Sequence, residues 1–318
     1  MDRVGRTGLA TGLTRGAIVL AVDGLAVEEA FDALPPRLRS GSTPWQRRAR
    51  AAFHILSTTR TSLRVTFRGL DDVVMSATLV LPKEMPDHTE HTGGEEAGPS
   101  ITWELLPSGL GLIRIPTFSP SGGHDLVSEF NTALGALMDA PGLIIDLRGN
   151  GGGSTALAER MAGRFLREAF LYGREYYRGR LPQRGWRLHL DYRVRPRPPV
   201  YPGQLVLLAD ELTMSTAEQF LVALVESGRA LLVGRRTAGS SGNPVRFRLP
   251  GGVARFSTGD FRRGDGTPIE GVGLVPHVPV AYTVADFRSG RDPDLEAAQG
   301  LLLAHGAPGG GMLGLKVG

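Results

Sequence analysis

Between residue 101 and about residue 290, strand-like apolar runs alternate with helical patterns, and this alternation constrains the fold more than any other feature. The strand-like runs are GLGLIRIPTF, PGLIIDLRG, GQLVLLAD and RALLVG, and the helical patterns lie near 124–139, 154–168 and 216–227. Strands that alternate with helices are typical of a parallel sheet with helices packed on its faces. The sequence therefore predicts an α/β core domain over residues 101–290.

The segments on either side differ from this core in composition. Residues 1–82 end in SLRVTFRG and VVMSATLVLP, whose alternation of apolar and polar residues predicts strands of a β-rich domain. Residues 83–100 are polar, acidic and contain Gly and Pro, which is typical of a linker. Residues 291–318 carry one short helical stretch and end in a Gly-rich segment that we expect to be flexible.

The composition excludes several kinds of chemistry. Hydrophobic residues make up 41% and charged residues 21% of the chain, which is typical of a globular protein. Because the chain has no cysteine, disulfides, thiol catalysis and cysteine metal sites are excluded. We expect no cofactor and no metal. The sequence shows neither a signal peptide nor an apolar run of roughly 20 residues, so no membrane span is expected. Compartment and oligomeric state are left unassigned.

Basic residues are mostly arginine, and only Lys83 and Lys316 are lysines. The net charge of +4 and the pI near 9.7 are weak signs of a polyanionic partner. Arginines interleave with aromatic residues over 173–199, a composition that can bind single-stranded nucleic acid. Their spacing favours instead a pair of strands with one charged face, so no nucleic-acid partner is predicted.

The segment GLIIDLRGNGGGSTALAERMAGRFL (142–166) carries the first motif. An apolar strand ends at Asp146, and a Gly-rich loop (149–153) then leads into an amphipathic helix with Ser154 at its N-cap. Such a loop leaves backbone N–H groups free to face an anion. It matches neither a phosphate-binding loop nor a dinucleotide fingerprint. The remaining interpretations are half of an oxyanion hole or a tight strand–helix turn.

The second motif is GQLVLLADELTMSTAEQFLVALVESGRALLVGRRTAG (203–239). A strand ends near Asp210, and after a short turn a helix begins at Ser215–Thr216. A serine at a sharp strand-to-helix turn exposes its hydroxyl, with the next N–H and the helix terminus beside a developing oxyanion. The alternative interpretation is a capping box, because Ser215 and Glu218 have the spacing Ser-x-x-Glu.

Taken together, IIDLRGNGGG, TMSTAE, VGRRTAG and DGTPIEGVGLVPHVPV (265–280) resemble, in the same order, the motifs of the C-terminal-processing and tricorn-core serine peptidases. The resemblance covers about residues 8–300. It implies an α/β core similar to that of the Clp protease and crotonase superfamily. It also implies that Ser215 is the nucleophile that becomes acylated. The oxyanion hole would consist of the backbone N–H of Thr216 and one backbone N–H from Gly151–Gly153, which we expect to be that of Gly152.

The chain departs from the family pattern at the residue that should act as the general base. Ser240 stands where the processing peptidases carry a lysine, and Lys83 and Lys316 lie in the linker and the tail. Arginine stays protonated and cannot replace the lysine. The tricorn-like branch, to which the chain is nearer, uses a histidine supported by a glutamate, and Glu270 matches that glutamate. A turn or surface carboxylate is the alternative interpretation of Glu270.

The histidine-bearing segment of that branch precedes a PDZ domain. The stretch GLTRGAIVLAVDGLAV resembles the middle of such a domain, which binds an extended peptide by adding it as a strand to a sheet. We therefore expect the chain to begin partway through the PDZ-like domain. None of the seven histidines matches the histidine of this branch. His277 lies in the fourth motif, at a place that the family usually gives to Asp, and His124 lies in a loop beside a helix start.

Two functions follow as hypotheses. The first is a serine endopeptidase that cleaves unfolded or C-terminal peptide segments through an acyl-enzyme at Ser215. The second is a catalytically impaired relative that binds peptides. Both predict polypeptide partners. An acyl-thioester enzyme of the related fold is a more distant third hypothesis, and the TMSTAE motif argues against it.

Overall fold

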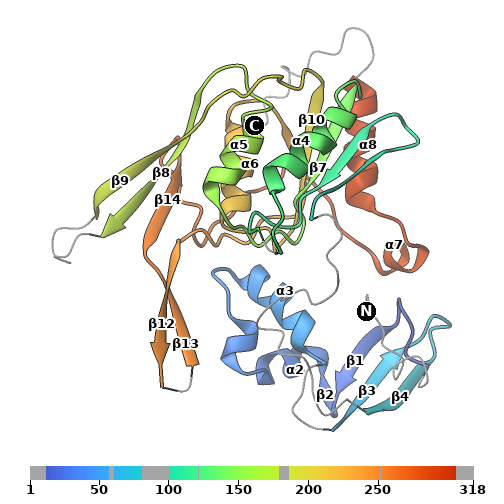
Figure 1. The fold of residues 1–318 in the computed structure, drawn as a ribbon. Coiled ribbons are helices and arrows are strands. Elements are labelled where there is room, and N and C mark those ends of the chain that lie inside the picture. The colour runs from blue at the N-terminus through green and yellow to red at the C-terminus, as the bar shows by residue number, and fades with distance from the viewer. Residues whose placement is uncertain are drawn as a thin grey trace. The chain divides into compact units, whose positions relative to one another are not determined.

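A computed structural model describes residues 12–56, 61–80, 100–120, 122–178, 186–250 and 252–305. The chain divides into two compact units, shown in Figure 1. The first unit consists of Met1–Glu96 with Tyr282–Pro293, and the second consists of Ala97–Ala281 with Asp294–Gly318. Most of the linker predicted at 83–100 lies outside the described residues.

The first unit is built on a four-stranded antiparallel sheet with helices beside it. The sheet has the order β2 (Leu25–Ala26), β1 (Ile18–Val22), β3 (Ser62–Arg68) and β4 (Val74–Val80). The helices are α2 (Val27–Ala33), the 3₁₀ helix η1 (Pro36–Arg39), α3 (Pro44–His54) and α7 (Val284–Ser289). A turn at Asp23 and Gly24, both with positive φ, joins β1 to β2. The β-rich domain is thus present, and its assignment as a PDZ domain stays a prediction.

The assignment of 101–290 as one core domain needs a correction at its C-terminal end. Helix α7 belongs to the first unit, because Arg288 donates from Nη2 to the carbonyl of Gly69 at 2.8 Å and from Nε to the carbonyl of Gly16 at 3.2 Å. Its Nη1 also lies 3.4 Å from Asp72 Oδ1. An arginine that bonds carbonyls more than 200 positions away carries no local sequence signal.

The second unit contains the predicted α/β core. Its six-stranded sheet has the order β15 (Val278–Pro279), β11 (Leu231–Gly234), β10 (Gln204–Ala209), β7 (Gly142–Asp146), β6 (Gly111–Arg114) and β5 (Thr102–Leu105). All neighbours are parallel except β5, which runs antiparallel to β6. Strands of a parallel sheet that is covered on both faces read as continuous apolar runs, and β7 is buried at all five positions.

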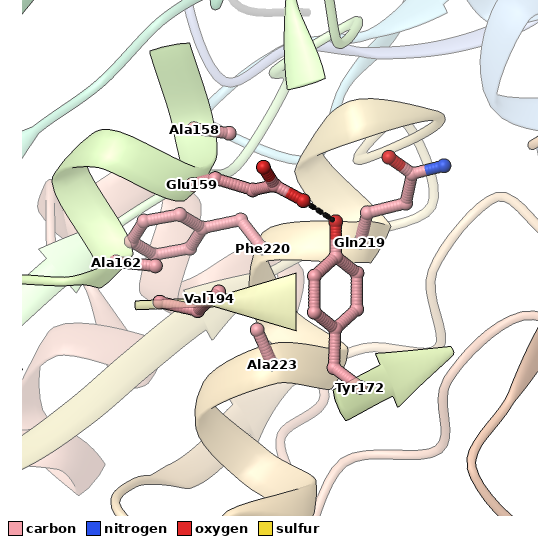
Figure 2. A pocket seen from close by; sticks show the side chains of 8 residues that line it. All are labelled: Ala158, Glu159, Ala162, Tyr172, Val194, Gln219, Phe220 and Ala223. Atoms are coloured by element: carbon pink, nitrogen blue, oxygen red, sulfur yellow. Dashed lines mark hydrogen bonds between the residues drawn. The ribbon is translucent and has the colours of Figure 1, made fainter. Parts of the chain in front are cut away.

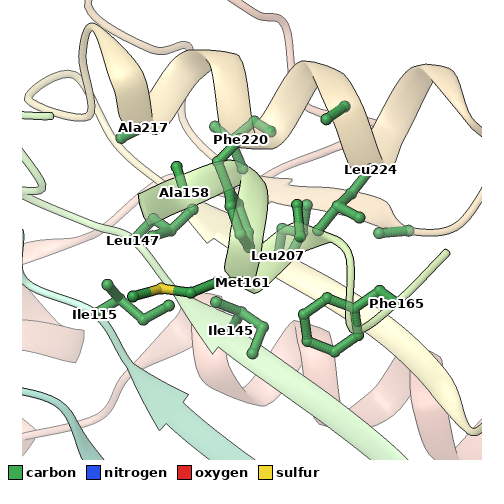
Figure 3. Packing of buried hydrophobic residues seen from close by; sticks show 14 of the residues in the cluster. Ile115, Ile145, Leu147, Ala158, Met161, Phe165, Leu207, Ala217, Phe220 and Leu224 are labelled. Carbon is green, nitrogen blue, oxygen red and sulfur yellow. The ribbon is translucent and has the colours of Figure 1, made fainter. Parts of the chain in front are cut away.

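Side chains of the central strands alternate between two apolar clusters. Leu143 and Ile145 of β7 face a large cluster with α4 (Leu126–Ala136), α5 (Thr155–Ala162) and α6 (Thr216–Glu226). Figure 3 shows part of this packing, with Phe220 of α6, Met161 of α5 and Ile145 of β7. Ile144 lies in a second cluster with Leu302 of α8 (Pro293–His305). The predicted C-terminal helix is therefore part of the core rather than of a tail.

Two smaller antiparallel sheets extend the second unit. One has the order β14 (Gly259–Arg263), β8 (Phe170–Arg178) and β9 (Trp186–Val194), and the other pairs β12 (Pro244–Leu249) with β13 (Gly252–Ser257). Strands β8 and β9 are the pair predicted from the arginine-rich stretch. In the described part of the chain, no helix has the length and apolar character needed to cross a membrane.

The packing of Phe165 provides a test of this core. Its side chain is 1% exposed, and its ring meets those of Phe130 and Tyr201 at 6.0 and 6.3 Å between centroids. We expect Phe165→Ala to lower the free energy of unfolding by about 3–5 kcal/mol, because it leaves a cavity. Phe256→Ala is the matched control. Phe256 is 58% exposed, so the loss should be at most about 1.5 kcal/mol. Urea titrations that gave equal losses would contradict this packing.

Candidate active site

Two strand-to-helix loops lie side by side at the carboxyl end of the parallel sheet. One loop (147–154) joins β7 to α5, and the other (210–215) joins β10 to α6. Because β7 and β10 are adjacent and parallel, both chains leave the sheet at the same edge. Open α/β sheets place their functional groups at this edge. The Gly-rich motif and the serine motif are therefore brought together by strand order.

Hydrogen bonds fasten the two loops to each other. Met214 N–H donates to the carbonyl of Asn150 at 3.0 Å, and Thr213 Oγ1 donates to the carbonyl of Leu147 at 2.9 Å. Asp210 Oδ1 accepts from Gly149 N–H at 2.9 Å and from two N–H groups of its own loop. These bonds hold the backbone of both loops in a single arrangement.

Ser215 has a strained backbone conformation. Its φ is 58° and its ψ is −127°, a region that only glycine occupies readily and that costs another residue about 1–3 kcal/mol. A serine that caps a helix normally has an extended backbone and accepts from an N–H of the first turn. Within the described residues, the Ser215 side chain makes no such capping bond. The geometry therefore favours a presented hydroxyl over the capping interpretation.

The Gly-rich loop touches Ser215 at Gly152. A Cβ added to Gly152 would lie 2.7 Å from Ser215 Cβ and 3.0 Å from the backbone N of Thr216, and its φ is +90°. Only a glycine allows the two loops to approach this closely. On the neighbouring helix, Ser154 stands at the predicted N-cap of α5, yet it makes no side-chain cap bond among the described residues.

The N–H groups of this site are not all free. Gly152 N–H, the predicted second oxyanion donor, donates to Asn150 Oδ1 at 2.8 Å. Asn150 is fully buried and its Nδ2 donates to the carbonyl of Ile115 at 2.8 Å, so this acceptor is fixed. In the described part of the chain, the N–H groups of Gly151 and Thr216 have no acceptor. Thr216 is held through Oγ1, which donates to the carbonyl of Gly153 at 2.7 Å.

A third segment, residues 237–241 after β11, completes the surroundings of Ser215. Ser215 N–H donates to the carbonyl of Ser240 at 2.9 Å and also lies 3.1 Å from Glu218 Oε2. Ser240 is the residue at the position of the processing-peptidase lysine. Its hydroxyl is no base at neutral pH, and its N–H donates to Glu218 Oε2 at 3.0 Å.

Glu270 lies on the opposite side of this third segment. Its Oε2 accepts from Ser241 N–H at 2.7 Å, one residue after the Ser240 carbonyl that holds Ser215. Ser215, Thr216 and Gly152 are thus in direct contact, whereas Glu270 is connected to Ser215 through two residues of backbone. Its side chain is half-buried and the residue lies in a turn, so the alternative interpretation as a turn carboxylate stays open.

Three histidines of the second unit, His124, His189 and His277, lie in other surroundings. His124 Nδ1 lies 2.6 Å from Glu129 Oε1 at the start of α4. His277 Nδ1 accepts from Leu232 N–H at 3.0 Å, and burial lowers the pKa of this imidazole. His189 lies 57% exposed on β9 beside Asp191. The structure places none of them on the three segments that surround Ser215.

A narrow pocket lies between α5, α6 and the ends of β8 and β9 (Figure 2). Its lining is mostly apolar, with Glu159 accepting from the Tyr172 hydroxyl at 2.9 Å. Burial raises the pKa of the Glu159 carboxyl. Gln219, one helical turn after Ser215, lies in the same lining, but the enclosed space is too small to hold a water molecule. Among the described residues, no group of three acidic or histidine side chains is placed to hold a metal.

Comparison with known proteins identifies the family. The model of peptidase family S41 matches residues 109–280, more than half of the chain. The chain therefore belongs to peptidase family S41, and the resemblance seen in its motifs is confirmed. Mature CPAF, whose crystal structure covers 94% of this chain and 78% of its own at 18% identity, has a TM-score of 0.73. This likeness confirms the α/β fold of the core.

Curated relatives match over part of their length. Tricorn protease homolog 1 of Streptomyces coelicolor is 28% identical over 201 residues, which are 61% of this chain and 17% of that protein. The carboxyl-terminal-processing protease of a Picosynechococcus species is 28% identical over 203 residues, 61% of this chain and 45% of that protein. A Chlamydia pneumoniae protein is 34% identical over 116 residues. The chain spans about a fifth of that protein's length.

Sequence reasoning missed three residues that build this site. Asp210 and Asn150 were seen only as part of a strand end and a Gly-rich loop, and Glu218 only as half of a capping box. A carboxylate directly after a buried strand was the available signal for Asp210, and an amide within the Gly-rich loop was the signal for Asn150. For Glu218 no local signal exists, since three of its donors lie about 20 positions further along the chain.

Because the two loops approach each other closely at Gly152, we predict that even an alanine at this position destabilises the protein. Gly152→Ala should lower the free energy of unfolding by at least about 1–2 kcal/mol, because an alanine is strained at φ +90° and its Cβ meets Ser215 Cβ. Gly135→Ala is the control. This glycine of α4 has open space around it, so alanine should be neutral or stabilise by up to about 1 kcal/mol. Equal denaturation midpoints for the two variants would rule out the contact.

Proposed function

We propose that this chain carries the catalytic site of a serine endopeptidase that forms an acyl-enzyme at Ser215. The observation that carries the proposal is the strained Ser215 backbone at φ 58°, which presents the hydroxyl beside the Gly-rich loop instead of capping α6. Membership of peptidase family S41 supports the reaction class. In this reaction Ser215 Oγ attacks the carbonyl carbon of a peptide bond, the C–N bond breaks, and water hydrolyses the resulting ester.

The oxyanion of the tetrahedral intermediate needs preorganised donors. We assign Thr216 N–H as one donor, because it is the first N–H of α6 and has no acceptor among the described residues. Gly151–Gly153 was predicted to supply the second. Since Gly152 N–H already donates to Asn150 Oδ1, the candidates for the second donor are Gly151 and Gly153, whose N–H groups have no acceptor among the described residues. Gly152 contributes by leaving space next to Ser215.

The proton of Ser215 needs a base, and here Glu270 is proposed to orient that base rather than to act as one. Its contact with Ser241 N–H places the carboxylate on the segment that also holds Ser215. A carboxylate in this position stabilises an imidazolium and fixes its orientation. Among the described histidines of the core, His124 and His277 use Nδ1 in other contacts, and His189 lies exposed beside Asp191.

The substrates proposed for this site are unfolded or C-terminal segments of polypeptides. This proposal rests on the resemblance to processing peptidases and on the relative named as a carboxyl-terminal-processing protease. A second candidate function is peptide binding without efficient cleavage. It is favoured by Ser240 at the lysine position and by the engaged Nδ1 atoms of His124 and His277.

The nucleophile assignment predicts a selective effect of Ser215→Ala. The variant should lose reaction with a fluorophosphonate and any peptide cleavage beyond the roughly 10³–10⁴-fold over water that an oxyanion hole and binding retain without a catalytic group. Its free energy of unfolding should change by less than the roughly 1 kcal/mol that removal of a helix cap costs, because the hydroxyl makes no capping bond. Retained cleavage would exclude Ser215 as the nucleophile. A stability loss of a full cap with unchanged labelling would support the capping interpretation.

Ser240 stands at the position of the lysine base, and His124 and His277 contact other groups. We therefore predict low peptidase activity for residues 1–318 expressed alone. Without a base, a serine peptidase retains the catalysis of its oxyanion hole and binding, roughly 10³–10⁴ over water. We expect slow cleavage of an unstructured peptide library, at about this level. Robust turnover that disappears in Ser215→Ala would contradict the expectation. His124→Gln and His277→Gln would then show whether either histidine is the base.

A further inference from the structure

Glu218 is the most deeply buried carboxylate in the surroundings of Ser215. Its side chain is 0% exposed, and its two oxygens accept from four donors. Oε1 accepts from Thr237 Oγ1 at 2.6 Å and Gly239 N–H at 2.8 Å. Oε2 accepts from Ser240 N–H at 3.0 Å and Ser215 N–H at 3.1 Å. A single carboxylate thus joins the first turn of α6 to the segment after β11.

These four bonds account for the strained Ser215 backbone. A left-handed, non-glycine conformation persists only where its surroundings determine it. The N–H of Ser215 donates to two acceptors, which are the Ser240 carbonyl and Glu218 Oε2. Glu218 Oε2 also accepts from the N–H of Ser240. In an ordinary capping box the serine hydroxyl would bond back to the helix. Here only the glutamate half of the box is made, so the hydroxyl stays available.

We propose that Glu218 is a positioning residue, whose ionised carboxylate holds Ser215 and the 237–240 segment in the arrangement that frees the Ser215 hydroxyl and the Thr216 N–H. The inference deepens the proposed peptidase function and rests on it for its consequence in catalysis. The structural part stands on the hydrogen bonds alone. Nothing in the sequence assigns Glu218 more than a cap.

The protonation state of Glu218 decides how many of these bonds form. Burial raises the pKa of the carboxyl to about 7, while each of the four hydrogen bonds opposes that shift. No charged side chain of the described residues contributes. The ionisable neighbours have other partners, since Arg235 pairs with Glu211 and Asp294, and Glu270 accepts from Ser241 N–H. A protonated carboxyl has a hydroxyl hydrogen facing a donor, so at least one of the four bonds must break.

The sign of the pH effect follows from the raised pKa. Protons bind more tightly to folded than to unfolded Glu218, so its contribution to stability is present at pH 4.5 and is lost as pH rises through about 7. The local bonds show the opposite trend. The four-donor arrangement is complete above pH 7 and loses a bond below it. Global stability and local protection are therefore expected to respond in opposite directions, a pattern that a purely structural carboxylate with an ordinary pKa does not produce.

The test is hydrogen–deuterium exchange of the full chain from pH 5.5 to 8.5, corrected for intrinsic rates. The variants are Glu218→Gln and, as matched control, Glu226→Gln, which changes a glutamate at the other end of α6 that accepts from Arg263. In the wild type, protection of the Ser215, Gly239 and Ser240 amides should fall at least tenfold as pH drops through about 7. In Glu218→Gln it should be low at every pH, because the amide group offers two donors where donors already point. Glu226→Gln should match the wild type.

Two results would overturn the proposal. One is wild-type protection of all three amides in Glu218→Gln. The other is weak protection of these three amides in the wild type at pH 8.5, where the carboxylate is ionised, a result that stays decisive even if Glu218→Gln fails to fold. Fluorophosphonate labelling separates this outcome from the peptidase proposal. If the wild type labels, Glu218→Gln should label at least tenfold more slowly. If the wild type does not label, the peptidase proposal fails while the exchange data still decide the role of Glu218.

Discussion

The hydrogen-bonded pairing of β7 with β10 determines where every residue of the site lies. The two strands run parallel with Ile145 opposite Leu207, so their loops leave the sheet together and Gly152 reaches Ser215. A shift of this register by one residue would separate the loop-to-loop bonds and turn buried side chains of both strands to the wrong face. The apolar clusters on the two faces make such a shift costly. The packing of the core therefore also fixes the geometry of the site, and it helps to maintain the strained backbone of Ser215.

Much of this arrangement could be predicted from the sequence, because it depends on local patterns. The strand ends at Asp146 and Asp210, the Gly-rich loop and the serine at a helix start follow from apolar runs and glycine spacing. Tertiary features could not be predicted. Glu218 matches a capping box, and only the fold shows its bonds to the segment after β11. Helix α7 likewise belongs to the first unit through Arg288, a contact with no local signature.

The site combines the proposed nucleophile Ser215 with surroundings in which the described residues place no histidine. Ser215, Thr216 and the Gly-rich loop are in direct contact, as the proposed acyl transfer requires, and Glu270 accepts from Ser241 N–H, one residue beyond these contacts. His124 and His277 serve the structure instead, one beside Glu129 and one in a bond to Leu232 N–H. The same arrangement is compatible with cleavage and with peptide binding. The backbone of the site is the same for both functions. Cleavage differs from peptide binding in that it requires a base to remove the proton of Ser215.

The backbone torsion angles of Ser215 in a crystal structure test the central claim most directly. The account predicts φ near +58° and ψ near −127°, with Glu218 Oε2 accepting from Ser215 N–H and the serine hydroxyl making no bond to α6. An extended Ser215 with negative φ, whose Oγ accepts from the N–H of Glu218, would contradict it. Ser215 would then be an ordinary helix cap.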